Sequence, residues 1–162
     1  MNINFTQFIF ALFCVIISTD ATGQNIDLNK SNIGINFGSE LNLNSIGFTV
    51  ETPLLDDYGE ISFNLIQQDF YKFSFLYKRY ADIELDDLPN LRFYYGLGPS
   101  IVIITNKIYY GGAASAGLDY SFDEIPLIVG VEIKPAYYAG LDLYFAQFGL
   151  FGKFNLAKQK AK

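Results

Sequence analysis

The sequence contains no histidine and no tryptophan, and its single cysteine is Cys14. Without histidine, the chain cannot form the Ser–His and His–Asp pairs that many hydrolases use. Zinc sites likewise lose their commonest ligand and keep at most one cysteine. The net charge of −6 provides no basic stripe for the phosphates of a nucleic acid. We therefore expect a non-enzymatic protein with no cofactor, no metal ion and no nucleic-acid partner.

Long hydrophobic runs are absent beyond residue 24, although hydrophobic residues make up 51% of the chain. A membrane-spanning helix needs about 18 apolar residues, so none is expected there. The one long run, at 8–17 (FIFALFCVII), has the length of a signal-peptide core, and small residues follow at 21–23. We predict a cleavable signal peptide over 1–23, cut near Gly23, and an exported protein. The alternative is a buried helix of the folded domain.

Cleavage would remove the cysteine and leave a mature chain without thiol chemistry or disulfides. The length of 162 residues suits one domain. We expect a flexible, polar mature N-terminus at 24–32, a folded domain at 33–156 and a basic C-terminal tail at 157–162.

Apolar and polar residues alternate along most of the folded domain, which is the period of β-strands. Turn-forming residues separate the alternating segments, with long connections at 52–58 and 81–90 and short ones at 67–69 and 123–124. This rhythm predicts an all-β fold, an eight-stranded antiparallel up-and-down β-barrel with larger loops at one end. The predicted strands are 33–38, 46–51, 61–65, 71–78, 91–98, 114–122, 127–134 and 144–154.

The alternation alone does not say which face of the barrel is apolar. A soluble barrel points its apolar residues inward, whereas a transmembrane barrel points them toward lipid. The polar set here is rich in glycine and serine, which suits a narrow lumen better than a solvated surface. Aromatic pairs near the strand ends, such as 109–110 and 137–138, are typical of the girdles at membrane interfaces, although a buried aromatic core is the alternative. We predict a transmembrane β-barrel with a polar lumen.

Four short stretches carry a resemblance to a known family: 93–98 (FYYGLG), 117–122 (GLDYSF), 124–127 (EIPL) and 132–135 (EIKP). Through them, the region 33–156 resembles the small outer-membrane β-barrel domain proteins of Gram-negative bacteria. The resemblance implies a barrel that the barrel-assembly machinery inserts into the cell outer membrane, surrounded by outer-membrane lipid. It also implies that both termini face the periplasm and that the longer loops face outward.

Charged residues on the predicted polar face have to be paired, because an unpaired charge inside a barrel is costly. We expect them to form an ionic network that fills the lumen. A carboxylate pair of Asp119 and Glu132, on neighbouring strands, is the alternative and would give an acid/base site. The predicted network consists of Glu51, Glu60, Lys72, Arg92, Asp119, Glu132, Lys134 and Lys153.

These expectations favour a structural or surface-interaction barrel with a side-chain-filled lumen, since eight strands leave no wide channel. Its loops at 52–58, 81–90, 105–108 and 139–143 would face outside or bind a partner. The alternative is a soluble periplasmic or membrane barrel that binds or transports a small apolar ligand. That alternative predicts a cavity lined by the apolar residues that interrupt the polar face, Leu76, Val102, Ile104 and Ile128.

Overall fold

The structure is a computed structural model that describes residues 30–40, 43–67, 70–83, 85, 88–141 and 144–159. The predicted signal peptide (1–23), most of the predicted flexible start and the end of the basic tail lie outside these residues. The elements are β1 (Asn32–Glu40), β2 (Leu43–Leu54), β3 (Asp57–Gln67), β4 (Phe70–Asp82), β5 (Leu91–Ile104), β6 (Lys107–Ser121), β7 (Leu127–Tyr138), β8 (Tyr144–Asn155) and the short helix α2 (Leu156–Gln159).

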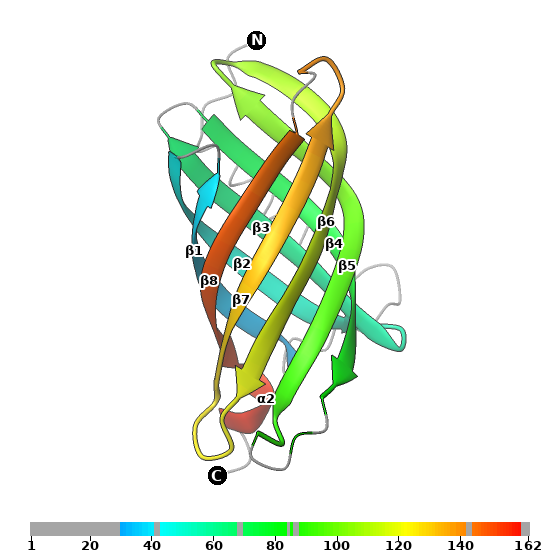
Figure 1. Ribbon diagram of the computed structural model, residues 1–162, viewed down its shortest axis with the longest axis vertical. Coiled ribbons are helices and arrows are strands. Elements are labelled where there is room, and N and C mark those ends of the chain that lie inside the picture. The colour runs from blue at the N-terminus through cyan, green and yellow to red at the C-terminus, as the bar shows by residue number, and fades with distance from the viewer. Residues whose placement is uncertain are drawn as a thin grey trace, which may run out of the picture.

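The strands form one closed barrel in which each strand pairs antiparallel with the next (Figure 1). β8 pairs with β1 from Asn32↔Asn155 to Glu40↔Gln147, and this pairing closes the sheet into a barrel. The predicted eight-stranded antiparallel up-and-down barrel is confirmed. In the described part of the chain, no helix is both long and apolar enough to cross a membrane.

The barrel has two unlike ends. At the terminal end, β1 begins, β8 ends and α2 lies, together with the connections 55–56, 83–90 and 122–126. The opposite end, here the distal end, carries the connections 41–42, 68–69, 105–106 and 139–143. The longest connection therefore lies at the same end as the termini. The expectation that 52–58, 81–90, 105–108 and 139–143 face one side, away from the termini, is wrong.

The predicted long loop at 52–58 is also wrong, because β2 and β3 continue through it to the pair Leu54↔Asp57. Only Leu55 and Asp56 remain as the turn. Pro53 was a signal for a loop. However, β1 begins at Asn32, opposite Glu51, so Pro53 has no β1 partner and lies on a free edge, where a strand tolerates proline.

The rim of the distal end is oblique. β1 has 9 residues and β6 has 15, so at a rise of about 3.4 Å per residue β6 is roughly 20 Å longer. In Figure 1 the β5–β6 hairpin reaches well above the distal end of β1. Ile108 and Tyr110, both exposed, carry the apolar outer face into this taller part of the wall.

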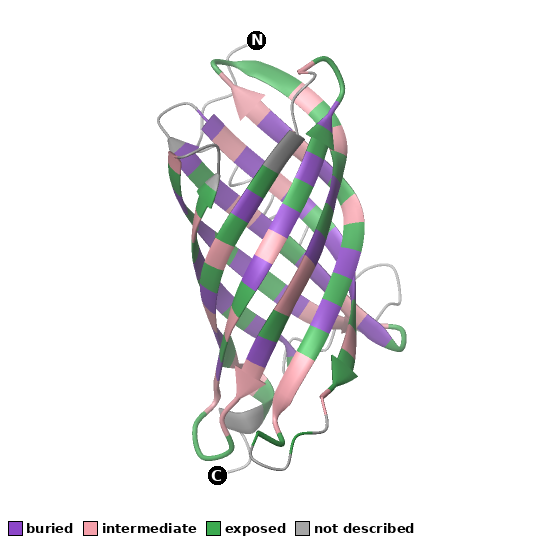
Figure 2. Ribbon diagram, in the orientation of Figure 1, coloured by how far each residue is buried: buried purple, intermediate pink, exposed green. Residues whose placement is uncertain are grey.

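Apolar side chains point outward and polar ones point inward. Along each strand buried and exposed residues alternate, which gives the banded pattern of Figure 2. The side chains of Leu97, Phe148 and Leu150 are 68%, 62% and 63% exposed, whereas Glu51 and Lys78 are 1% and 0% exposed. This confirms the predicted polarity of the two faces, which is the reverse of a soluble barrel.

Glycines of the lumen face make room for large side chains of the neighbouring strand. A Cβ atom on Gly117 would lie 2.6 Å from the hydroxyl oxygen of Tyr94, too close for any real side chain. The glycine-rich polar face is thus a packing requirement of a narrow lumen. The same relation holds for Gly96 under Lys78, Gly34 under Lys153 and Gly130 under Phe151.

A charge placed on the outer face tests whether that face contacts lipid. We expect Leu150→Arg to destabilise the barrel in lipid vesicles by about 2–4 kcal/mol, as for cations near the middle of a bilayer. Glu124→Arg, in the exposed 122–126 connection, is the control and should have little effect. Denaturant unfolding in vesicles measures both, and an equal response of the two variants would contradict a lipid-facing wall.

Candidate functional site

Charged and hydroxyl-bearing side chains fill the terminal half of the lumen. They come from inward-facing positions. Every second side chain of a strand points to the same face, as Glu132 and Lys134 do on β7. Because these side chains are almost fully buried, each must find its partners inside the barrel.

Glu60 is the centre of this group. Its carboxylate lies 2.5 Å from the Nζ atom of Lys78, 3.0 Å from that of Lys134 and 3.3 Å from that of Lys153. All four side chains are at most 4% exposed. One carboxylate on β3 therefore links β4, β7 and β8 across the lumen.

Glu51 is the second bridging carboxylate. It lies 2.7 Å from Nζ of Lys153 and accepts hydrogen bonds from the Tyr80 hydroxyl at 2.7 Å and the Asn32 amide at 2.8 Å. Lys78 approaches it at 3.8 Å, so Lys78 and Lys153 are shared between Glu51 and Glu60. β1 and β2 join the network in this way.

The remaining strands join through Glu132, Arg92 and Asp119. Glu132 lies 3.0 Å from Nζ of Lys134 and accepts a hydrogen bond of 2.9 Å from the Tyr94 hydroxyl. Arg92 donates to both carboxylate oxygens of Asp119, at 2.9 and 3.0 Å, and its guanidinium lies 4.4 Å from the centre of the Tyr80 ring. The network thus touches all eight strands. We call it the ionic cluster: Asn32, Glu51, Glu60, Lys78, Tyr80, Arg92, Tyr94, Asp119, Glu132, Lys134 and Lys153.

Seven of the eight predicted lumen charges lie in this cluster, and Lys72 does not. Lys72 lies in the distal half of the lumen, where it donates to Gln147 at 3.0 Å. The prediction omitted Lys78, which contacts both Glu51 and Glu60. Lys78 lies six residues after Lys72 on β4 and shares its face, so the alternation alone would have found it.

The carboxylates of Asp119 and Glu132 do not form a pair with each other. Asp119 is occupied by the fork of Arg92, and Glu132 by Lys134 and Tyr94. The described residues also contain no group of histidine, cysteine, aspartate and glutamate suited to a metal ion. The chemistry that this cluster supports is mutual neutralisation of charge.

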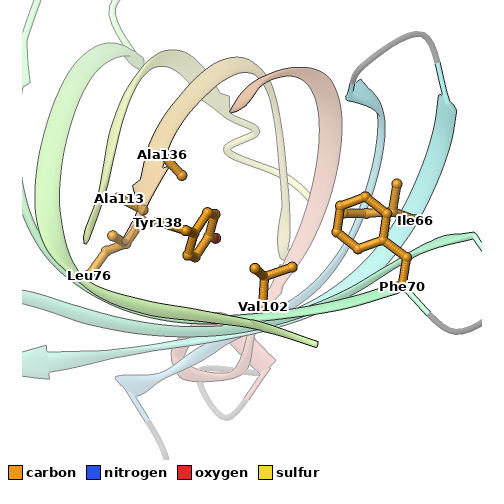
Figure 3. Close-up of a cluster of buried hydrophobic side chains, with 7 residues drawn as sticks. All are labelled: Ile66, Phe70, Leu76, Val102, Ala113, Ala136 and Tyr138. Carbon is orange, nitrogen blue, oxygen red and sulfur yellow. The ribbon is translucent and has the colours of Figure 1, made fainter. Parts of the chain in front are cut away.

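The distal half of the lumen holds a cluster of apolar side chains beside the buried polar pair of Lys72 and Gln147. Seven buried side chains point into the barrel there and pack together (Figure 3). This plug consists of Ile66, Phe70, Leu76, Val102, Ala113, Ala136 and Tyr138.

The predicted apolar cavity is not formed. Leu76 and Val102 belong to the plug and Ile104 packs against it, whereas Ile128 packs with Tyr94 and Phe151 in the terminal half. The four residues are separated because Ile128 lies near the terminal end of β7, while Val102 and Ile104 lie near the distal end of β5.

An open groove of about 820 Å³ lies on the outer wall across β5 to β8 and β1. Its lining is almost entirely apolar, which suits contact with lipid chains rather than with water. The outward side chains that line it include Phe37, Phe93, Leu118, Val131, Phe148 and Leu150.

The closed eight-stranded wall matches one group of solved structures in its fold. The chain has the fold of a small outer-membrane β-barrel. The N-terminal β-barrel domain of Pseudomonas aeruginosa OprF aligns with a TM-score of 0.60 and 20% identity, over 78% of this chain and 97% of that domain. Neisserial surface protein A aligns with a TM-score of 0.52 and 9% identity, over 77% of this chain and 94% of that protein.

A third similar structure is the outer membrane enzyme PagL, with a TM-score of 0.51 and 14% identity, over 76% of this chain and 98% of that enzyme. No protein-family model and no curated protein sequence matches the chain. The predicted resemblance to small outer-membrane barrels is confirmed at the level of the fold. At these identities the likeness concerns the fold, and it transfers no activity.

Removal of the central carboxylate tests the ionic cluster. We expect Glu60→Gln to destabilise the barrel by about 3–5 kcal/mol, because three buried lysines would face two glutamates. Glu124→Gln is the matched control, since Glu124 is exposed in the 122–126 connection. Denaturant titration in vesicles gives both free energies of unfolding. Equal values would show that the cluster adds nothing to stability.

Proposed function

We propose that the protein is a non-enzymatic β-barrel of the bacterial outer membrane with a closed lumen and a structural or surface-interaction role. The observation that carries this proposal is the polarity of the wall, apolar outside and charged inside. In water, such a wall would expose apolar rows on every strand, whereas lipid covers them favourably. Outer-membrane lipid is therefore the principal partner.

Two barriers in series support a closed lumen. The ionic cluster fills the terminal half with side chains that bridge opposite strands, as Lys134 and Lys153 do at Glu60. The apolar plug, together with the hydrogen-bonded pair of Lys72 and Gln147, occupies the distal half. A hydrated ion would have to displace both, so passage of ions or polar solutes is not the proposed role.

Packing also supports a non-enzymatic role. Each carboxylate of the ionic cluster has a cationic partner, which leaves no acid or base poised for a substrate. The alternative of a barrel for a small apolar ligand has less support, because the apolar lumen residues pack against one another.

The proposed location implies insertion by the barrel-assembly machinery after export, and any further partner would meet the barrel at its ends. The connection 83–90 at the terminal end is longer than any distal connection, of which 139–143 is the longest. A loop-bound partner would therefore find its larger contact area at the terminal end.

Fractionation of cells that express the full chain tests the location. We expect the protein in the outer-membrane fraction, and we expect the folded barrel to migrate differently on a gel before and after boiling. Leu150→Arg at equal expression is a useful companion, because its weaker insertion should reduce the heat-modifiable form. Recovery of the parent protein in the soluble periplasm, without a shift on boiling, would refute the proposal.

Planar-bilayer recordings test the closed lumen. Purified barrel should add no current to a bare bilayer, because the ionic cluster and the plug block the axis in series. A wide porin reconstituted in the same bilayer is the positive control. Discrete current steps that scale with the amount of barrel would overturn the closed lumen.

A further inference from the structure

The tip of the β2–β3 hairpin leaves the barrel wall. β1 pairs with β2 only as far as Asn32↔Glu51, and β4 pairs with β3 only as far as Tyr58↔Lys78. Beyond these pairs, the ends of β2 and β3 within residues 52–57 pair only with each other in the described part of the chain. In Figure 1 the tip extends to the right, past β5 and clear of the wall.

The tip presents a leucine in a conformation that does not suit leucine. Leu55 is 86% exposed, the highest value among the exposed large hydrophobic residues that the structure describes. Its φ angle is +57°, in the left-handed region that favours glycine and asparagine. A turn residue chosen for geometry alone would be glycine, so the apolar side chain has another reason to be there.

The base of the hairpin tip is tied to the outer face of β4 through Asp57. The Asp57 carboxylate accepts a hydrogen bond of 2.7 Å from the Tyr77 hydroxyl. It also accepts bonds of 3.0 and 2.8 Å from Nε and Nη2 of Arg79. This brace holds Leu55 at a defined place beside the wall, so the exposed leucine is not a feature of a loose loop.

The tip continues the apolar outer face. Leu54 and Phe75 both lie over Gly59 on the outside of the barrel, and Phe75 and Ile61 are 41% and 44% exposed. The apolar band thus passes from the wall into the hairpin, where Tyr77 and Arg79 flank it. Tyrosine and arginine next to an apolar band are typical of the membrane–water interface.

We propose that the β2–β3 tip is a lipid anchor at the terminal side of the barrel, in which Leu55, backed by Leu54, inserts into the edge of the bilayer. The inference rests on the proposed membrane location. We assign lipid as the partner of the tip because the tip is continuous with the lipid-facing wall. Lipid would then cover the apolar side chain of Leu55, which is exposed in the protein alone.

The absence of tryptophan permits a direct test, since Leu55→Trp creates a single tryptophan in the whole chain. The variant is reconstituted in vesicles of dioleoylphosphatidylcholine and of the same lipid with brominated chains, which quench tryptophan on contact. Leu150→Trp, in the wall, is the positive control. Asn106→Trp is the matched control, because Asn106 is an exposed turn residue with a φ angle of +64° at the distal end.

We expect Leu55→Trp to lose at least half as much emission to the brominated lipid as Leu150→Trp does, with emission shifted to the blue of Asn106→Trp. If Leu55→Trp is unquenched while Leu150→Trp is quenched, the anchor is refuted and the membrane barrel stands. Equal quenching of Leu55→Trp and Asn106→Trp also refutes it, because tryptophan itself would then be the cause. If Leu150→Trp is unquenched, the proposed function fails.

A second variant separates anchoring from folding. Leu55→Gly removes the side chain and suits the positive φ angle, so the barrel should fold with an unchanged heat-modifiable shift. Loss of folding in this variant would assign Leu55 to the barrel itself and would overturn the anchor.

Discussion

The ionic cluster is the constraint on which the rest of the barrel depends. Four carboxylates and four cations are taken out of water in a narrow lumen, and each is tolerable only because its partners arrive from other strands. That requirement fixes the register of the strands, since a slip by one residue would turn the charges of that strand toward the outer face. It also explains the lumen glycines, because Lys78 and Lys153 need the space above Gly96 and Gly34.

The two halves of the lumen are filled by different kinds of side chain. Near the termini, the charged side chains of the ionic cluster are paired with one another. Paired charges have little affinity for solutes. Near the distal end, apolar side chains pack as they would in the core of a soluble protein. Under the proposed function, these features and the apolar outer face serve the insertion and stability of the barrel, and contacts with other molecules would concentrate at its rims and its hairpins.

The sequence predicted the strands and the two faces well because alternation is a local signal. All eight segments, from 33–38 to 144–154, are strands, and the apolar side of each faces outward. The ends of the strands were predicted less well. Pro53 and Gly59 resemble loop residues, and only the structure shows that β1 begins opposite Glu51 and leaves the tip of β2 on a free edge. The sharing of Lys78 and Lys153 between Glu51 and Glu60 was out of reach, because it depends on register around the closed barrel.

In the proposed membrane location, the oblique distal rim has a consequence for the bilayer. Beside β1 the apolar wall is short, whereas beside β6 it continues through Ile108 and Tyr110. The apolar wall is shorter than the lipid chains need on one side of the barrel and longer on the other. Each ångström of this hydrophobic mismatch costs a fraction of a kcal/mol. The barrel axis should therefore incline within the membrane. Where inclination does not remove the mismatch, shorter acyl chains should gather along β1 and longer ones along β6, so that one small protein sorts lipids around its own circumference.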